Sequence, residues 1–152
     1  MDLDPTDRRI LEALQKQGRK SNQDLSDSVN LSPSACHRRV QRLEEEGFIK
    51  GYVALLDPRR MGRLTTVFVE ITLSGQADEV LDAFERAVSR VPEVLECHLM
   101  AGSADYLLKV VAMDTEDFAR IHRRSLATLP GVRGIQSSFA LRTVRQTTAL
   151  PV

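Results

Sequence analysis

The chain has 152 residues, long enough for one ordinary domain or two small ones. Its 21 Lys and Arg residues balance 21 Asp and Glu residues, so the overall charge gives no argument for a nucleic-acid or membrane partner. Charged residues at 28% and hydrophobic ones at 42% are typical of a soluble globular protein. The chain opens without a secretory signal pattern and has no membrane-spanning apolar run, so we expect a cytoplasmic protein without a membrane partner.

Three helices in succession are predicted for residues 1–50. Asp4 and Pro5 supply an N-cap and a proline at the first helical position, and Ser32 and Pro33 repeat this pair at the third helix. Ser21 begins a second helix of only about two turns, and glycines at positions 18 and 47 end the first and third. The short turn between the last two helices is typical of a helix-turn-helix module.

The pattern changes after the third helix. The stretch "FIKGYVALLDPRRMG" predicts an extended strand or wing that leads into a linker at residues 51–63. Strand and helix patterns then alternate as strand 64–73, helix 77–90, strand 94–101, strand 105–113, helix 115–129 and strand 134–144. The order βαββαβ over residues 64–152 predicts a ferredoxin-like domain, so the fold class is α+β.

The third helix has two different faces. Stepping 100° per residue places Cys36, Val40 and Leu43 on the packed side. The outward side carries Ser34, His37, Arg38, Gln41 and Arg42. Arginine can bridge guanine O6 and N7, glutamine can pair with adenine, and hydroxyl or backbone N–H groups at a helix N-terminus can hold phosphate. This set of outward side chains predicts a helix that enters the major groove of double-stranded DNA.

The alternative is an ordinary solvated helix face, with pairs such as Arg42 with Glu45. The length of the preceding helix, the confinement of acids to the C-terminal end and the wing-like segment favour DNA. We assign base edges to Arg38, Gln41 and Arg42 and phosphates to Ser32, Ser34 and Arg39, with His37 open between the two; Lys20 and Lys50 can add backbone contacts.

Other classes of function fit the residues less well. The order βαββαβ is also that of the RNA-recognition motif, but the strand "YLLKVVAM" lacks the aromatic signature on which that motif depends. Cys97 and His98 are adjacent on a predicted strand, so they point to opposite faces and cannot pair as nucleophile and base. His122 lies on an apolar helix face without metal-ligand spacing around it. We therefore expect no enzyme, no metal and no cofactor.

Several stretches resemble the Lrp/AsnC family, the feast/famine regulators of bacteria and archaea: "LDPTDRRILEALQKQGR", "LSPSACHRRVQRLEEEGFIKGYVALLDPRRMG", "MAGSADYLLKV" and "TTALPV". The resemblance covers nearly the entire chain. It implies a plain or winged helix-turn-helix domain, a hinge strand, and a ligand-binding domain that builds homodimers, often assembled into octamers. It also implies control of transcription in response to a small amino acid. The alternative is a DNA-binding or architectural protein of the same fold that needs no effector.

The stretch Met100–Asp105 joins two predicted strands. From the residues alone it is a hairpin connection, because Gly102, Ser103 and Asp105 are common turn residues. The resemblance implies that this loop forms part of the effector pocket, together with the last strand. That assigns Met100, Ala101, Gly102, Ser103, Ala104 and Asp105 to the effector, with backbone N–H groups for its carboxylate and Asp105 for its ammonium. Ser137 and Ser138 are weaker candidates, because alternate strand residues often face solvent.

Overall fold

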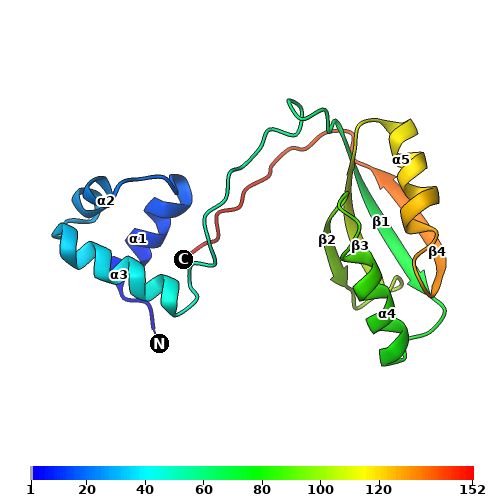
Figure 1. The fold of residues 1–152 in the computed structure, drawn as a ribbon, viewed down its shortest axis with the longest axis horizontal. Coiled ribbons are helices and arrows are strands. Elements are labelled where there is room, and N and C mark those ends of the chain that lie inside the picture. Colours follow the sequence, from blue (N-terminus) through cyan, green and yellow to red (C-terminus); the bar gives the residue numbers. More distant parts are fainter. Residues whose placement is uncertain (1) are drawn as a thin grey trace. The chain divides into compact units, whose positions relative to one another are not determined.

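The computed structural model of the chain describes residues 2–152. It divides the chain into two compact units (Figure 1). The first reaches Leu55 and includes Arg145–Val152, and the second is Leu56–Val144. The last eight residues thus lie with the N-terminal helices, whereas the sequence alone had assigned them to the C-terminal domain. Within the described residues, no helix is long and apolar enough to cross a membrane.

The first unit contains three helices, α1 (Pro5–Lys16), α2 (Asn22–Val29) and α3 (Pro33–Glu45). All three predicted N-caps are confirmed, since Asp4, Ser21 and Ser32 each accept a hydrogen bond from a backbone N–H in the first turn. The turn between α2 and α3 is made by Asn30 in the left-handed conformation, with φ of 57°. The small core of this unit consists of Ile10, Leu11, Leu25, Val29, Cys36 and Leu43.

The segment after α3 differs from the expectation. In this part of the described chain, residues 46–64 form no strand, and a turn and bend at residues 46–48 and a second turn at residues 58–62 interrupt the extended path. The expected extended segment is therefore present, but it is not paired as a strand within the described residues. An extended segment becomes a strand only when a neighbouring strand bonds its backbone, and this segment has no such partner here.

The second unit is a four-stranded antiparallel sheet with helices on one face (Figure 1). Its elements are β1 (Thr65–Leu73), α4 (Asp78–Val88), β2 (Val94–Leu99), β3 (Tyr106–Ala112), α5 (Thr115–Ile121) with a following π-helical turn (His122–Leu126), and β4 (Val132–Phe139). The strand order β2-β3-β1-β4 confirms the ferredoxin-like fold. The π turn, closed by Ala127 N–H donating to the His122 carbonyl at 2.8 Å, occupies much of the end of the predicted long helix.

Side chains of β1 alternate between the two faces of the sheet. Val67, Val69 and Ile71 are fully buried beneath the helices, while Phe68 and Glu70 point to the opposite face and are exposed. The same alternation on β3 buries alternate residues from Tyr106 to Ala112. One face of the sheet therefore forms the core and the other is open, and this open face carries the cleft described below.

Candidate DNA-binding helix and effector cleft

The outer side of α3 carries unpaired polar groups. His37, Arg38 and Gln41 are exposed, and none makes a side-chain hydrogen bond or ion pair among the described residues. The inner side is packed as the sequence predicts, since Cys36 and Leu43 are completely buried. This face is free to meet a partner with hydrogen-bond acceptors and negative charge.

The N-terminus of α3 adds two hydroxyl groups. Ser32 Oγ accepts a hydrogen bond from Ala35 N–H at 3.2 Å and lies 3.3 Å from Ser34 Oγ. Both serines are exposed. Hydroxyl groups beside the free N–H groups of a helix N-terminus are suited to a phosphate oxygen.

Two arginines of α3 have a different placement from the one expected. Arg42 Nη2 donates to Asp7 Oδ2 at 2.6 Å, and Arg39 Nη1 donates to Asp7 Oδ1 at 2.8 Å and to Asp4 Oδ2 at 2.6 Å. The Asp7 side chain is only 1% exposed. Arg42 lies at the border between the two faces, where the buried carboxylate on α1 attracts its guanidinium. The prediction that the Arg42 side chain points outward is therefore wrong. The Arg39 side chain likewise points toward α1.

The ion pairs also affect the N-cap of α1. The hydrogen bond from Arg39 is the largest cause that lowers the pKa of Asp4, from 3.8 to about 2, followed by the backbone N–H of Asp7. Asp4 also completes a reciprocal capping box with Asp7. The cap at Asp4 is predictable from the sequence, but no local pattern predicts the pairing of Asp4 and Asp7 with arginines 32 to 35 residues away.

A hollow of about 380 Å³ lies beside the exposed face of α3. Lys20, Asn22, His37 and Gln41 are among the residues that line it. Asn22 Nδ2 donates to the carbonyl of Pro33 at 2.8 Å and so ties α2 to the start of α3. The hollow therefore brings Lys20 to the same surface as the predicted reading residues, whereas Lys50 lines a separate groove.

The loop between β2 and β3 is closed by a hydrogen bond from Met100 N–H to the Asp105 carbonyl at 2.8 Å. Asp105 is 8% exposed, and its carboxylate accepts from Leu73 N–H at 2.7 Å and from Gln76 Nε2 at 3.0 Å. The carboxylate is turned into the fold and fixes the end of β1. This placement contradicts the predicted contact between Asp105 and an effector ammonium.

A cleft of about 340 Å³ is present next to this loop. Its lining consists of Glu70, Thr72, Ser103, Ala104, Gly134, Ile135 and Gln136. Of the predicted loop residues, Ser103 and Ala104 reach the cleft, while Met100, Ala101 and Gly102 lie outside its lining. Among the described residues, the backbone N–H groups of positions 101–104 have no hydrogen-bond partner. They remain available to an anion.

The register of β4 decides which of its residues face the cleft. Ser137 pairs with Val69, whose side chain is buried, so Ser137 points to the helix-covered face. Gln136 pairs with Glu70 on the open face and lines the cleft. Ser137 is therefore misplaced in the prediction, and Gln136 and Glu70 were missed. A shift of one residue exchanges the two faces, which the sequence of β4 alone does not determine.

Comparison with protein families gives two matches that together cover most of the chain. Residues 3–50 match a winged helix-turn-helix DNA-binding domain, and residues 66–150 match the Lrp/AsnC ligand binding domain. The chain is also 44% identical over 151 residues to the leucine-responsive regulatory proteins of Escherichia coli and Salmonella typhimurium, covering 99% of this chain and 92% of each relative. This chain belongs to the Lrp/AsnC family. It is a DNA-binding transcriptional regulator with a ligand-binding domain.

Solved structures of Lrp/AsnC regulators have the same architecture. A transcriptional regulator from Neisseria meningitidis, solved with L-Met, superposes with a TM-score of 0.94 at 38% identity, covering 99% of this chain and 97% of that one. An AsnC family regulator from Agrobacterium tumefaciens gives a TM-score of 0.94 at 40% identity, covering 98% and 97%. The feast or famine regulatory protein of M. tuberculosis, solved with L-methionine, gives 0.87 at 30% identity, covering 98% and 99%.

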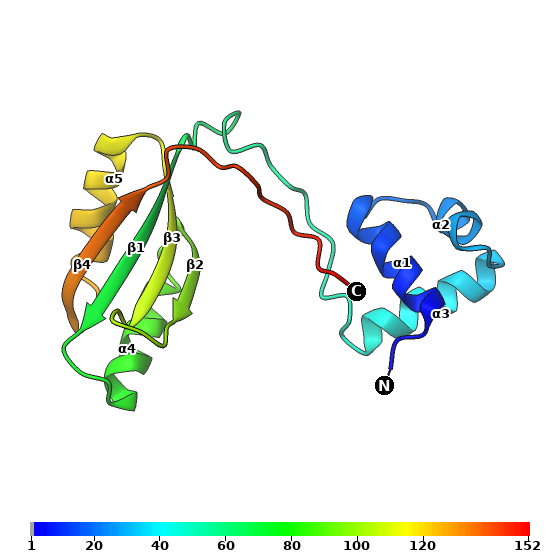
Figure 2. The same ribbon diagram turned by 180° about the vertical axis from the view of Figure 1, so that it is seen from behind.

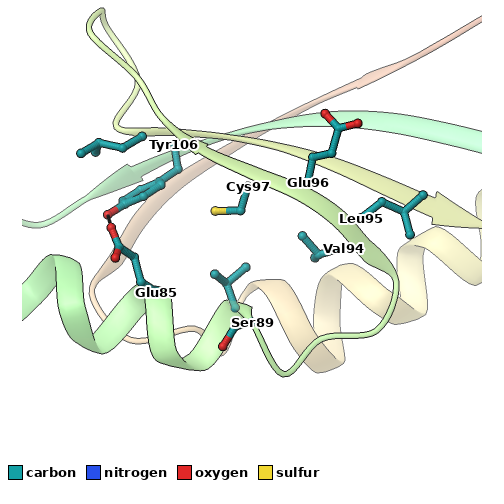
Figure 3. A pocket seen from close by; sticks show the side chains of 9 residues that line it. Glu85, Ser89, Val94, Leu95, Glu96, Cys97 and Tyr106 are labelled. Carbon is teal, nitrogen blue, oxygen red and sulfur yellow. Dashed lines mark hydrogen bonds between the residues drawn. The ribbon is translucent and has the colours of Figure 1, made fainter. Parts of the chain in front are cut away.

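A further cavity of about 440 Å³ lies between α4 and the edge strand β2 of this Lrp/AsnC chain (Figure 3). Tyr106 Oη donates to Glu85 Oε1 at 2.6 Å across it, and the Cys97 side chain points into it. Burial, and secondarily Glu85, raises the pKa of Cys97 to about 11. The thiol is therefore protonated at neutral pH and a poor nucleophile. His98 lies on the other side of the strand and contacts Glu96, as alternation predicts.

Proposed function

We propose that this regulator reads double-stranded DNA with α3 and responds to a small amino acid bound in the cleft between the β2–β3 loop, β1 and β4. The observation that carries the proposal is the outer face of α3, where Arg38, Gln41 and His37 are exposed and have no side-chain partner in the part of the chain that the structure describes. No carboxylate lies on this helix before Glu44. Arg38 and Gln41 are assigned to base edges, Ser32 and Ser34 to phosphates, and His37 to either.

Arg39 and Arg42 receive a different assignment in this proposal. Because both neutralise Asp7, they hold α3 against α1 and set the orientation of the reading face. Their side chains are 31% and 37% exposed, so each retains N–H groups that can also reach a phosphate. Lys20 adds a cation at the same surface.

The cleft has the groups that a free amino acid requires. The unpaired N–H groups of positions 101–104 suit its carboxylate, and the Glu70 carboxylate with the Gln136 amide suits its ammonium. A volume of about 340 Å³ is at the lower end of the range of small-molecule sites. The Lrp/AsnC relatives solved with methionine support this ligand class.

We further propose that the protein acts as a homodimer that can assemble to an octamer. The open face of the sheet exposes Phe68, and the segment after α3 exposes Val53, Leu55 and Leu56 at 82%, 73% and 68%. Exposed apolar side chains on each of these two surfaces favour association with another chain. Two copies of α3 then meet successive major grooves of a site with twofold symmetry.

A thermal-shift screen against the twenty amino acids tests the effector cleft. We expect at least one to raise the melting temperature by several degrees, since saturation at about 100 times the dissociation constant adds about 2.7 kcal/mol. The shift should vanish in Glu70→Gln and persist in the control Glu79→Gln, which alters an exposed acid on α4. The effector assignment is wrong if no amino acid stabilises the protein, or if Glu70→Gln responds like the wild type.

A further inference from the structure

Among the described residues, the C-terminal segment Arg145–Val152 is hydrogen-bonded to the helical unit through one side chain. Gln15, on α1, donates from Nε2 to the carbonyl of Leu150 at 2.9 Å and accepts from Leu150 N–H at 2.6 Å. The two bonds use both backbone groups of one residue, as a neighbouring β-strand would. Gln15 therefore holds this segment in a defined register.

A groove of about 390 Å³ runs along this attachment. Its lining includes Gln15, Phe48, Ile49, Tyr52 and, from the tail itself, Leu150. The side chains of Phe48 and Leu150 remain 42% and 72% exposed, so the groove is only partly filled. A segment held by two solvent-accessible hydrogen bonds and few apolar contacts opens far more easily than the core.

The wall of this groove is attached to the C-terminal end of α3. Ile49 N–H donates to the Leu43 carbonyl at 3.1 Å, and Tyr52 Oη donates to Glu44 Oε1 at 2.9 Å. Burial, followed by the Glu44 hydrogen bond, raises the pKa of Tyr52 to about 12, so the hydroxyl remains a donor throughout the neutral range. A docked tail therefore rests on residues that fix the last turn of α3.

At its other end the tail is the direct continuation of β4, which Figure 2 shows as the orange strand passing into the red terminus. The last backbone bond to the sheet is donated by Ala140 N–H to the Thr66 carbonyl at 2.9 Å. Gly134 and Gln136, on the same strand, line the effector cleft. One continuous stretch of chain thus carries a wall of the cleft and the segment that docks beside α3.

We propose that residues 145–152 are a releasable strap that, when docked on Gln15, stabilises the C-terminal end of α3 and so raises the affinity for DNA. The inference rests on the proposed function for its DNA readout. Loss of the strap increases the number of conformations open to the segment after α3, and DNA binding must then restrict them at a cost in affinity. Because β4 continues directly into the strap, an effector bound at Gln136 can change the attachment of Leu150 to Gln15 through the connecting chain.

Hydrogen exchange and DNA titration on the full-length protein test the strap. Gln15→Ala removes both bonds to Leu150, and Gln17→Ala, an exposed position at the end of the same helix, is the matched control. In Gln15→Ala we expect faster exchange of the Leu150 and Ile49 amides and a several-fold weaker affinity for the DNA upstream of the protein's own gene. Gln17→Ala should match the wild type in both measurements.

The two readouts separate the strap from the proposed function. The inference is wrong if the Leu150 amide is unprotected from exchange in the wild type. It is wrong too if Gln15→Ala speeds exchange of the Leu150 amide but leaves exchange of the Ile49 amide unchanged, because the strap then does not support α3. A third contradicting result would be faster exchange of the Ile49 amide in Gln15→Ala with no change in the affinity for DNA. A wild type that binds no DNA contradicts the proposed function instead, while the exchange of Ile49 still decides whether the strap stabilises α3.

Discussion

Arg42 on α3 donates to the carboxylate of Asp7 on α1 at 2.6 Å, and this carboxylate is 1% exposed. A buried negative charge is costly unless it is paired, and Arg39 supplies the second partner at 2.8 Å. The two arginines thus satisfy both oxygens of Asp7 from adjacent turns of α3. The arrangement fixes the rotation of α3 about its axis, and hence which residues face outward.

Removal of this carboxylate should destabilise the helical unit. Asp7→Ala leaves two partly buried guanidinium groups without their shared partner and breaks the capping box of α1. We expect a loss of about 2–4 kcal/mol in the free energy of unfolding, measured by urea denaturation. Glu12→Ala, an exposed acid on the same helix, is the control and should change stability by less than about 0.5 kcal/mol. Equal effects of the two substitutions would contradict a structural role for Asp7.

The lowered pKa of Asp4 predicts an acid-dependent loss of stability. Its pKa in the folded protein, about 2, lies below the ordinary 3.8, so the ionised group stabilises the fold above pH 3.8. This contribution is lost as the pH falls through about 2. Asp4→Asn should therefore flatten the stability profile between these two values, measured by denaturation at a series of pH values. A mutant profile as steep as that of the wild type would show that Asp4 does not contribute to the acid loss.

Asp105 should behave as a structural residue. In Asp105→Ala the Leu73 N–H loses its acceptor in a buried site, which we expect to cost about 1–3 kcal/mol of stability. Asp82→Ala, an exposed acid on α4, serves as the control in the same denaturation experiment. A stable Asp105→Ala protein that loses only its amino-acid response would instead restore the ammonium-binding role.

Lys20 should contribute to DNA binding through phosphate alone. In Lys20→Ala we expect weaker binding to specific and unrelated DNA by the same factor, because a phosphate contact carries no sequence information. The slope of log K against log salt concentration should fall by about 1. Titrations at three salt concentrations measure both quantities. A changed preference between the two DNA sequences would show that Lys20 reads bases.

The helices and the order of the strands could be predicted because their signals are local. Capping residues such as Asp4 and Ser32 determine where a helix starts within a few positions, and strand patterns repeat every two residues. The inward face of α3 was likewise predictable, since periodicity placed Cys36 and Leu43 together.

The predictions that failed concern pairs of residues that lie far apart in the sequence. The pairing of Arg42 with Asp7 spans 35 positions, and the docking of Leu150 on Gln15 spans 135. No spacing rule connects such positions. The prediction of Ser137 instead of Gln136 as a cleft residue failed for a different reason. The register between β4 and β1 is fixed by cross-strand pairing, which the sequence of one strand does not determine.

The assignment of α3 as the reading helix is tested most directly by a fluorescence-anisotropy titration of the DNA upstream of the protein's own gene. We expect Arg38→Ala to weaken binding by roughly 5- to 150-fold and to reduce the preference over shuffled DNA, as loss of a base-edge contact does. Its stability should be unchanged, and Arg86→Ala, an exposed arginine on α4, should bind like the wild type. Wild-type affinity and sequence preference in Arg38→Ala would show that α3 does not read bases through Arg38.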